Sequence, residues 1–189
     1  MKLPIVAYGD PVLKKHSEDI SEEYPQLDIL IGNMFDTMYA ASGVGLAAPQ
    51  IGLPIRLFII DTTPFFEDEL TLINPKKVFI NAHISEEKGD KWVFNEGCLS
   101  IPDVREDVSR HPEIFISYYD ENWNFYKETF IGITARVIQH EYDHIEGKLF
   151  TDRINPLRKT MLKGKLDSIS KGLIKVDYKM RFPNSNKKR

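Results

Sequence analysis

The sequence predicts an α+β fold in which mixed or antiparallel strands pack around a central helix with an HExxH motif, followed by a C-terminal helix. Short β-branched and aromatic runs, bounded by turn residues, occupy much of residues 56–130 and predict strands. Helical spacing of apolar residues then recurs from Ile133 to Ile145. Because these strands precede the motif helix instead of alternating with helices, a doubly wound parallel sheet is not expected.

The first expected element is a helix over residues 26–41, where apolar side chains recur on one helical face. This apolar stripe consists of Leu27, Leu30, Ile31, Met34 and Met38. The glycines of Gly43-Val44-Gly45 follow directly and are suited to end that helix.

Strands are expected in the middle of the chain. Residues 56–61 (RLFIID) are short and apolar, as in a buried strand, and residues 70–73 and 77–80 read as further strands around Asn74-Pro75. The polar residues 62–69 are expected to form a loop.

A hairpin is expected near the end of the strand region. Residues 114–119 and 123–130 are rich in aromatic and β-branched residues, and they flank the turn sequence Asp120-Glu121-Asn122. The polar residues 84–91 are expected to form a second loop.

Composition indicates one domain. The 189 residues are 42% hydrophobic, which is enough for a substantial core. We expect residues 1–154 to form a catalytic part, and residues 155–189 a basic helix and tail of the same domain. The lack of a long apolar run or an N-terminal signal pattern predicts no membrane segment and a cytoplasmic location. The single cysteine excludes an internal disulfide and suits a reducing compartment.

The most informative stretch is Gln139-His140-Glu141-Tyr142-Asp143-His144. On a helix, residues at i and i+4 share one face, so both imidazoles can reach one metal ion. The carboxylate between them can move a proton of a water molecule that the ion activates. Thr134 is a candidate cap and Gly147 a candidate stop for this helix. HExxH has only three fixed letters, however, so two ordinary histidines without a metal remain the alternative.

A third ligand has to come from upstream, because no His or Glu follows Glu146. The upstream candidates are Cys98, His16, His83 and His111. A thiolate is a strong ligand for a transition metal, and two histidines with one cysteine leave the fourth position open, as in catalytic sites. A lone cysteine is more often a small buried apolar residue, so residue chemistry alone does not decide this point.

Three motifs resemble those of a known family, peptide deformylase. They are Gly43-Val44-Gly45-Leu46-Ala47-Ala48-Pro49-Gln50, Glu96-Gly97-Cys98-Leu99-Ser100 and the HExxH stretch. Their order and spacing are similar to those of the family, and the resemblance runs from about Leu3 to about Leu157.

The resemblance implies a role for each motif residue. Cys98, His140 and His144 would bind one divalent transition metal, natively iron(II), for which zinc, nickel or cobalt can substitute. Glu141 would be the acid–base group. The Gln50 side-chain amide and the Leu99 backbone N–H would donate hydrogen bonds to the oxyanion.

Substrate contacts are expected around the same motifs. The backbone at Gly43, Gly45 and Gly97 can approach a peptide closely because these residues lack side chains. Val44 and Val137 are candidates for the methionine pocket, although a plain core role is the alternative. Arg105 matches a family position at the cleft, with a solvated surface charge as its alternative. Glu96 and Asp143 are expected to accept hydrogen bonds that orient the ligands.

The implied activity is removal of the N-formyl group from the formyl-methionine of nascent peptides. The alternatives are a general metallopeptidase or amidase, and a non-catalytic metal-binding protein associated with ribosomes. No G-x-G-x-x-G sequence lies in a strand–turn–helix setting, so no nucleotide cofactor is expected. Residues 153–189 hold twelve Lys or Arg against two Asp, whereas the whole chain carries −3. A basic helix over residues 155–175 could therefore contact rRNA near the ribosomal exit tunnel, as the family implies.

Overall fold

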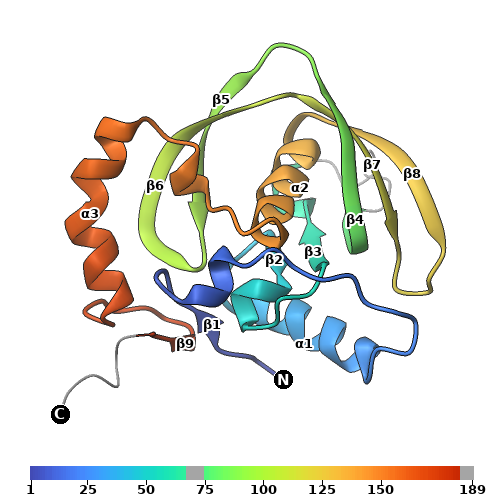
Figure 1. Ribbon diagram of the computed structural model, residues 1–189, viewed down its shortest axis with the longest axis horizontal. Helices are drawn as coiled ribbons and strands as arrows, with labels where there is room; N and C mark the ends of the chain where they lie inside the picture. Colours follow the sequence, from blue (N-terminus) through green and yellow to red (C-terminus); the bar gives the residue numbers. More distant parts are fainter. Residues whose placement is uncertain (67–74, 184–189) are drawn as a thin grey trace.

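The structure is a computed structural model that describes residues 1–66 and 75–183 (Figure 1). Its main sheet has five strands in the order β2-β3-β4-β7-β8, and each neighbouring pair is antiparallel. These strands are β2 (Gly45–Ala47), β3 (Leu57–Asp61), β4 (Lys76–Lys88), β7 (Glu113–Tyr119) and β8 (Phe125–Ile131). The described residues also contain an antiparallel pair, β5 (Trp92–Cys98) and β6 (Ile101–Arg110), and a parallel pair, β1 (Ile5–Val6) and β9 (Met180–Arg181).

Three α-helices accompany these sheets in the described residues: α1 (Leu27–Ala40), α2 (Gly132–Ile145) and α3 (Pro156–Ser170). Short 3-10 turns cover Pro11–Lys14, Ala48–Ile51, Thr63–Phe65 and Phe150–Asp152. The predicted α+β class with antiparallel strands is confirmed. No helix in the two described ranges is long and apolar enough to cross a bilayer.

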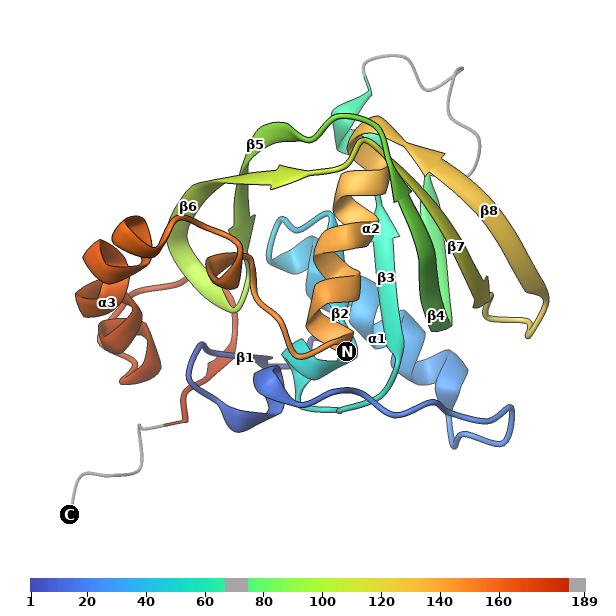
Figure 2. The same ribbon diagram turned by 45° about the horizontal axis from the view of Figure 1, so that its top comes forward.

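Strand β3, which lies between β2 and β4, explains how α2 is held. Its side chains alternate between two cores, so that Leu57 and Ile59 pack with α1 whereas Phe58 and Ile60 pack with α2. Both faces of β3 are therefore buried, which is why its sequence is an unbroken apolar run. In Figure 2, α2 lies between the five-stranded sheet and the β5–β6 hairpin.

A third core joins the hairpin to the C-terminal helix. Val104 and Val108 of β6 pack with Leu166 and Ile169 of α3. Asn155 caps α3 by accepting a hydrogen bond from the Leu157 N–H at 2.8 Å. The helix ends at Ser170, so the expected helix over residues 155–175 is shorter than predicted.

Some of the other expected helices and strands are confirmed, and some lie outside the described residues. The helix at residues 26–41, the strands at 56–61 and 77–80, and the hairpin of 114–119 with 123–130 are confirmed. The expected strand at residues 70–73 lies outside the described residues, as do residues 67–69 of the expected loop, whose described part contains the 3-10 turn Thr63–Phe65.

Three expectations were wrong or incomplete. Residues 84–88 are not a loop but the end of β4, where polar side chains face solvent while the backbone pairs with β7. Thr134 is not a cap, because α2 already begins at Gly132. Strands β5 and β6 were not anticipated. The stop after α2 is as expected: Gly147 has φ +69° and follows the C-cap residue Glu146.

Candidate active site

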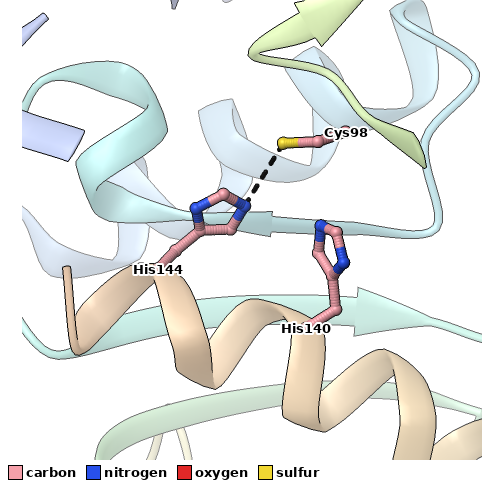
Figure 3. Close-up of side chains that lie close together, drawn as sticks. All are labelled: Cys98, His140 and His144. Carbon is pink, nitrogen blue, oxygen red and sulfur yellow. Dashed lines mark hydrogen bonds between the residues drawn. The ribbon is translucent and has the colours of Figure 1, made fainter. Parts of the chain in front are cut away.

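Three side chains converge between α2 and the β5–β6 hairpin. Cys98 comes from the last residue of β5, and His140 and His144 come from successive turns of α2. One ligand atom from each lies within 4.8 Å of the other two, and the Cys98 Sγ is 3.3 Å from the His144 Nε2 (Figure 3). His144 is fully buried whereas Cys98 and His140 are partly exposed, so the cluster has an open side.

This Cys/His/His site fits a divalent transition metal. The donor set combines a thiolate with two imidazoles, which such ions accept. Burial keeps the pKa of His144 well below its usual value, so the ring is neutral and can act as a ligand. Burial also lowers the pKa of His140, but hydrogen bonds with Cys98 and Glu96 outweigh it and raise the pKa to about 10. The site thus favours positive charge at the place where an ion would sit.

The hairpin turn places Cys98 toward the helix. Cys98 pairs with Ile101, so Leu99 and Ser100 form a two-residue turn, and the strand register shifts between Gly97 and Cys98. Such an irregularity redirects the side chain that follows it. The sulfur points toward the His144 ring of α2 (Figure 3).

A buried charge network orients His140. Glu96 accepts hydrogen bonds from the His140 Nδ1 at 2.9 Å and from two nitrogens of Arg110 at 2.7 and 2.9 Å. It accepts a further one from Arg136 at 2.7 Å. Burial raises the pKa of Glu96, but the hydrogen bonds from Arg110 and His140 outweigh it and hold the pKa well below its usual range. With its Nδ1 engaged, His140 has its Nε2 left for a metal.

The network continues to the other predicted carboxylate. Arg110 also donates to Asp143 at 2.7 Å, and Asp143 accepts further hydrogen bonds from Arg153. The sequence indicated Glu96 and Asp143 but not Arg110 or Arg136. The position of Arg136 on α2, one turn before His140, was the only available signal.

Glu141 is buried directly beside the cluster. Within the described part of the chain its Oε2 has no hydrogen-bond partner. Burial raises the pKa of Glu141 to about 7, because the charged form loses its hydration. A carboxyl group with this pKa can take up and release a proton near neutral pH.

Gln50 faces the Cys/His/His cluster from the 3-10 turn Ala48–Ile51, which follows β2. Its Oε1 accepts a hydrogen bond from the Ala47 N–H at 2.8 Å, which fixes which way the amide points. Its Nε2 lies 3.4 Å from both the Cys98 Sγ and the Ser100 Oγ. The amide N–H group is therefore directed at the cluster, where a donor was expected.

A cleft of about 650 Å³ opens over these groups. Its lining includes every predicted metal-binding, catalytic and substrate-contacting residue except the deeply buried His144: Gly43, Val44, Gly45, Gln50, Gly97, Cys98, Leu99, Arg105, Val137, His140 and Glu141. Of the two carboxylates predicted to orient the ligands, Glu96 lines the cleft and Asp143 does not. Arg105 lies at the exposed edge, where its Nε donates to the Asn95 side chain at 2.9 Å. Phe94, Ile133 and Arg136 also line the cleft and were not predicted.

Gly45 is needed for Glu141 to sit where it does. A Cβ at Gly45 would lie 2.7 Å from the Glu141 Cδ and closer still to its Oε1. We expect Gly45→Ala to displace this carboxylate and to lower kcat/KM about 10²-fold, as a misplacement of about 1 Å can. Rates of formate release from a formyl-Met peptide, the substrate that the sequence resemblance implies, measure this loss.

Gly164→Ala is the matched control, because a Cβ at Gly164 in α3 meets nothing within 4 Å. This variant should keep the wild-type rate and gain up to about 1 kcal/mol of stability. Equal rates in both variants would contradict the packing of Gly45 on Glu141.

A sequence model of the polypeptide deformylase family matches residues 2–160, well over half of the chain. The chain belongs to the polypeptide deformylase family. Among curated relatives, the peptide deformylase of Christiangramia forsetii is 61% identical over the full length of both chains. That of Flavobacterium psychrophilum is 56% identical, and the alignment covers 96% of this chain and 97% of the relative.

Solved structures of peptide deformylases have a fold similar to that of this chain. A peptide deformylase from Legionella pneumophila superposes with a TM-score of 0.79 at 35% identity, covering 92% of this chain and 98% of that one. One from Synechococcus elongatus, in complex with actinonin, has a TM-score of 0.76 at 40% identity, with 86% and 85% covered. Membership of this family confirms the predicted activity, a metal-dependent hydrolase that removes the formyl group from N-terminal formyl-methionine.

Proposed function

We propose that this deformylase holds one catalytic metal ion through Cys98, His140 and His144 on α2 and the β5–β6 hairpin, with Glu141 as its acid–base group. The observation that carries this proposal is a buried carboxylate with a free oxygen next to a Cys/His/His cluster at the floor of a cleft. A structural metal site needs no such carboxylate.

The donor set suits iron(II), zinc, nickel and cobalt, and we propose iron(II) as the native ion on the basis of the family resemblance. When bound, such an ion lowers the pKa of a water molecule to about 7 and polarises a carbonyl. Glu96 keeps the His140 ring in the orientation that a ligand needs, through the hydrogen bond to Nδ1.

Glu141 takes a proton at Oε2 as water attacks the formyl carbon, and it delivers that proton to the departing amine. Its Oε2 has no hydrogen-bond partner among the described residues, so this oxygen is available to the proton. The Gln50 Nε2 and the Leu99 backbone N–H donate to the oxygen of the formyl group as negative charge develops there. Gln50 is a neutral donor, so it stabilises this charge without neutralising Glu141.

The peptide is bound by backbone on two sides of the cleft. Gly43 and Gly45 on one side and Gly97 on the other leave room for an extended chain to pair in strand fashion. Val44 and Val137 contact the methionine side chain from the apolar wall. Arg105, at the exposed edge, contacts the peptide further along.

Formate release from a formyl-Met tripeptide tests the proposed function, with the product peptide identified by mass. The expected result is formate together with an intact tripeptide. Cleavage of internal bonds would indicate a general metallopeptidase. A fully metallated protein without turnover would indicate a non-catalytic metal-binding protein.

We further propose that residues 1–154 are the catalytic part, that residues 155–189 are a helix and tail of the same domain, and that the protein works in the bacterial cytoplasm, where nascent chains emerge. Leu157 and Met161 of α3 are exposed, and basic residues accompany them, which supports a contact with the ribosome. Several of these cations are already paired, as Arg158 is with Glu106 and Lys171 with Asp167. The contact would rest on the remaining cations and on the apolar pair.

We expect the full chain to co-sediment with ribosomes at low salt and to be released as salt rises, because contacts with phosphates release counterions. Leu157→Glu combined with Met161→Glu should weaken this co-sedimentation while leaving formate release unchanged. Equal pelleting of the variant and the wild type would contradict docking through α3.

A further inference from the structure

The chain between α3 and β9 lines the cleft although it lies beyond the residues that the family model matches. Residues 175–178, here called the return segment, follow α3 and lead back to β1, with which β9 pairs (Figure 1). All four residues contribute to the cleft that also contains Cys98 and Glu141. The match to the family model ends at residue 160, whereas the relative from Christiangramia forsetii aligns over the whole chain.

Tyr178 is the contact between the return segment and the reaction site. Its hydroxyl donates a hydrogen bond to the Leu99 carbonyl at 2.7 Å. Its ring packs in the same core as the Leu99 side chain. Burial, with the negative charges of Cys98 and Asp103 nearby, raises the pKa of Tyr178, so the hydroxyl remains a donor throughout the physiological range.

Both backbone carbonyls of the Leu99-Ser100 turn accept a hydrogen bond. Tyr178 holds that of Leu99, and the Tyr8 N–H donates to that of Ser100 at 2.8 Å. The turn connects Cys98 with the next strand and carries the Leu99 N–H. Movement of the turn would therefore move a proposed oxyanion donor.

The return segment does not need the Tyr178 hydroxyl in order to stay in place. On its C-terminal side, the Ile5 N–H donates to the Lys179 carbonyl at 2.8 Å, and the Ala7 N–H donates to the Arg181 carbonyl at 2.9 Å. The backbone pairing of β9 with β1 thus anchors the chain independently. The hydroxyl contributes its hydrogen bond to the turn.

We propose that Tyr178 is a positioning residue for deformylation, which fixes the Leu99 turn so that the Leu99 N–H is aligned with the reacting carbonyl. This inference rests on the proposed function and deepens it. The return segment is accordingly part of the active site and forms one wall of the peptide cleft.

Tyr178→Phe in the full-length, metal-loaded enzyme tests this proposal. The variant removes one hydroxyl and keeps the ring in its core. We expect kcat to fall about tenfold, because one of two oxyanion donors is misaligned but not lost. KM for a formyl-Met tripeptide should change less than about twofold, since ground-state contacts persist. Metal content should equal that of the wild type.

Tyr118→Phe is the matched control. The Tyr118 hydroxyl is also partly buried and donates to a carboxylate, that of Glu128 on the neighbouring strand β8, outside the cleft. Both variants should lose comparable stability in urea unfolding, but only Tyr178→Phe should lose kcat.

A Tyr178→Phe variant with wild-type kcat overturns the proposal. So does a loss of rate that follows metal content, or one that Tyr118→Phe shares. A wild-type enzyme that releases no formate would instead overturn the proposed function, so the two failures are distinguishable.

Discussion

Glu141→Gln is expected to abolish most of the activity while the metal stays bound. The carboxylate is the only group beside the cluster that we assign to proton transfer, and general acid–base catalysis contributes about 10²- to 10⁴-fold to a rate. The amide has nearly the same shape, so kcat should fall by that factor with little change in packing. Formate release and metal content, measured on the same preparation, give the result.

The same substitution should stabilise the metal-free protein at neutral and higher pH. Burial raises the pKa of Glu141 from 4.5 to about 7, so the folded state holds a proton that the unfolded state releases. The wild type therefore loses stability as pH rises from about 4.5 through about 7, and Gln removes this loss. Unfolding free energies of both metal-free proteins across this range should diverge with rising pH.

Glu146→Gln is the control, because Glu146 follows the same helix and pairs with Arg56 away from the cleft. It should keep the wild-type kcat. A Glu141→Gln enzyme that retains both metal and near-normal kcat would contradict the acid–base role.

Glu96→Gln is expected to have the largest effect on stability. Glu96 is 5% exposed and neutralises Arg110 and Arg136, which are also buried. Removing one partner from such a buried network costs about 3–5 kcal/mol, because charges are left unpaired. The loss of the acceptor for the His140 Nδ1 should also weaken metal affinity about 10- to 100-fold.

The pH dependence gives this prediction a second check. The pKa of Glu96 is held below its usual value of 4.5, so its contribution to stability is complete above that pH and is lost as pH falls further. The difference in unfolding free energy between the wild type and Glu96→Gln should therefore be largest near pH 7 and shrink below about pH 4.5.

Glu106→Gln serves as the comparison, since Glu106 is similarly buried but pairs with Arg158 of α3. It should lower stability without changing metal affinity. If Glu96→Gln behaved like Glu106→Gln in both measurements, Glu96 would have no special role in orienting His140.

The strands that sequence could predict are those rich in apolar, β-branched or aromatic side chains. β3 was recognisable because cores on both of its faces require apolar residues. β6 was not, because Glu106 and Arg110 occupy inward positions that a simple apolar alternation assigns to Val or Ile. These charges are tolerated only because partners from α3, β5 and α2 neutralise them, and such partners are distant in sequence.

The candidate site was predictable to the extent that its motifs are local. His140, Glu141 and His144 lie within five consecutive residues of one helix, and Gly43 to Gln50 form one continuous stretch. Arg110, Arg136 and Tyr178 were missed because their hydrogen-bond partners are distant in sequence. Their roles depend on the tertiary contacts that place Glu96 and the Leu99 carbonyl beside them.

X-ray absorption at the metal edge of the enzyme loaded with one equivalent of cobalt(II) tests the central assignment most directly. We expect one sulfur ligand and two imidazole nitrogens in wild type, with a light-atom ligand from solvent, and no sulfur in Cys98→Ser. A wild-type spectrum without sulfur, or with four protein ligands, would contradict an open site formed by Cys98, His140 and His144.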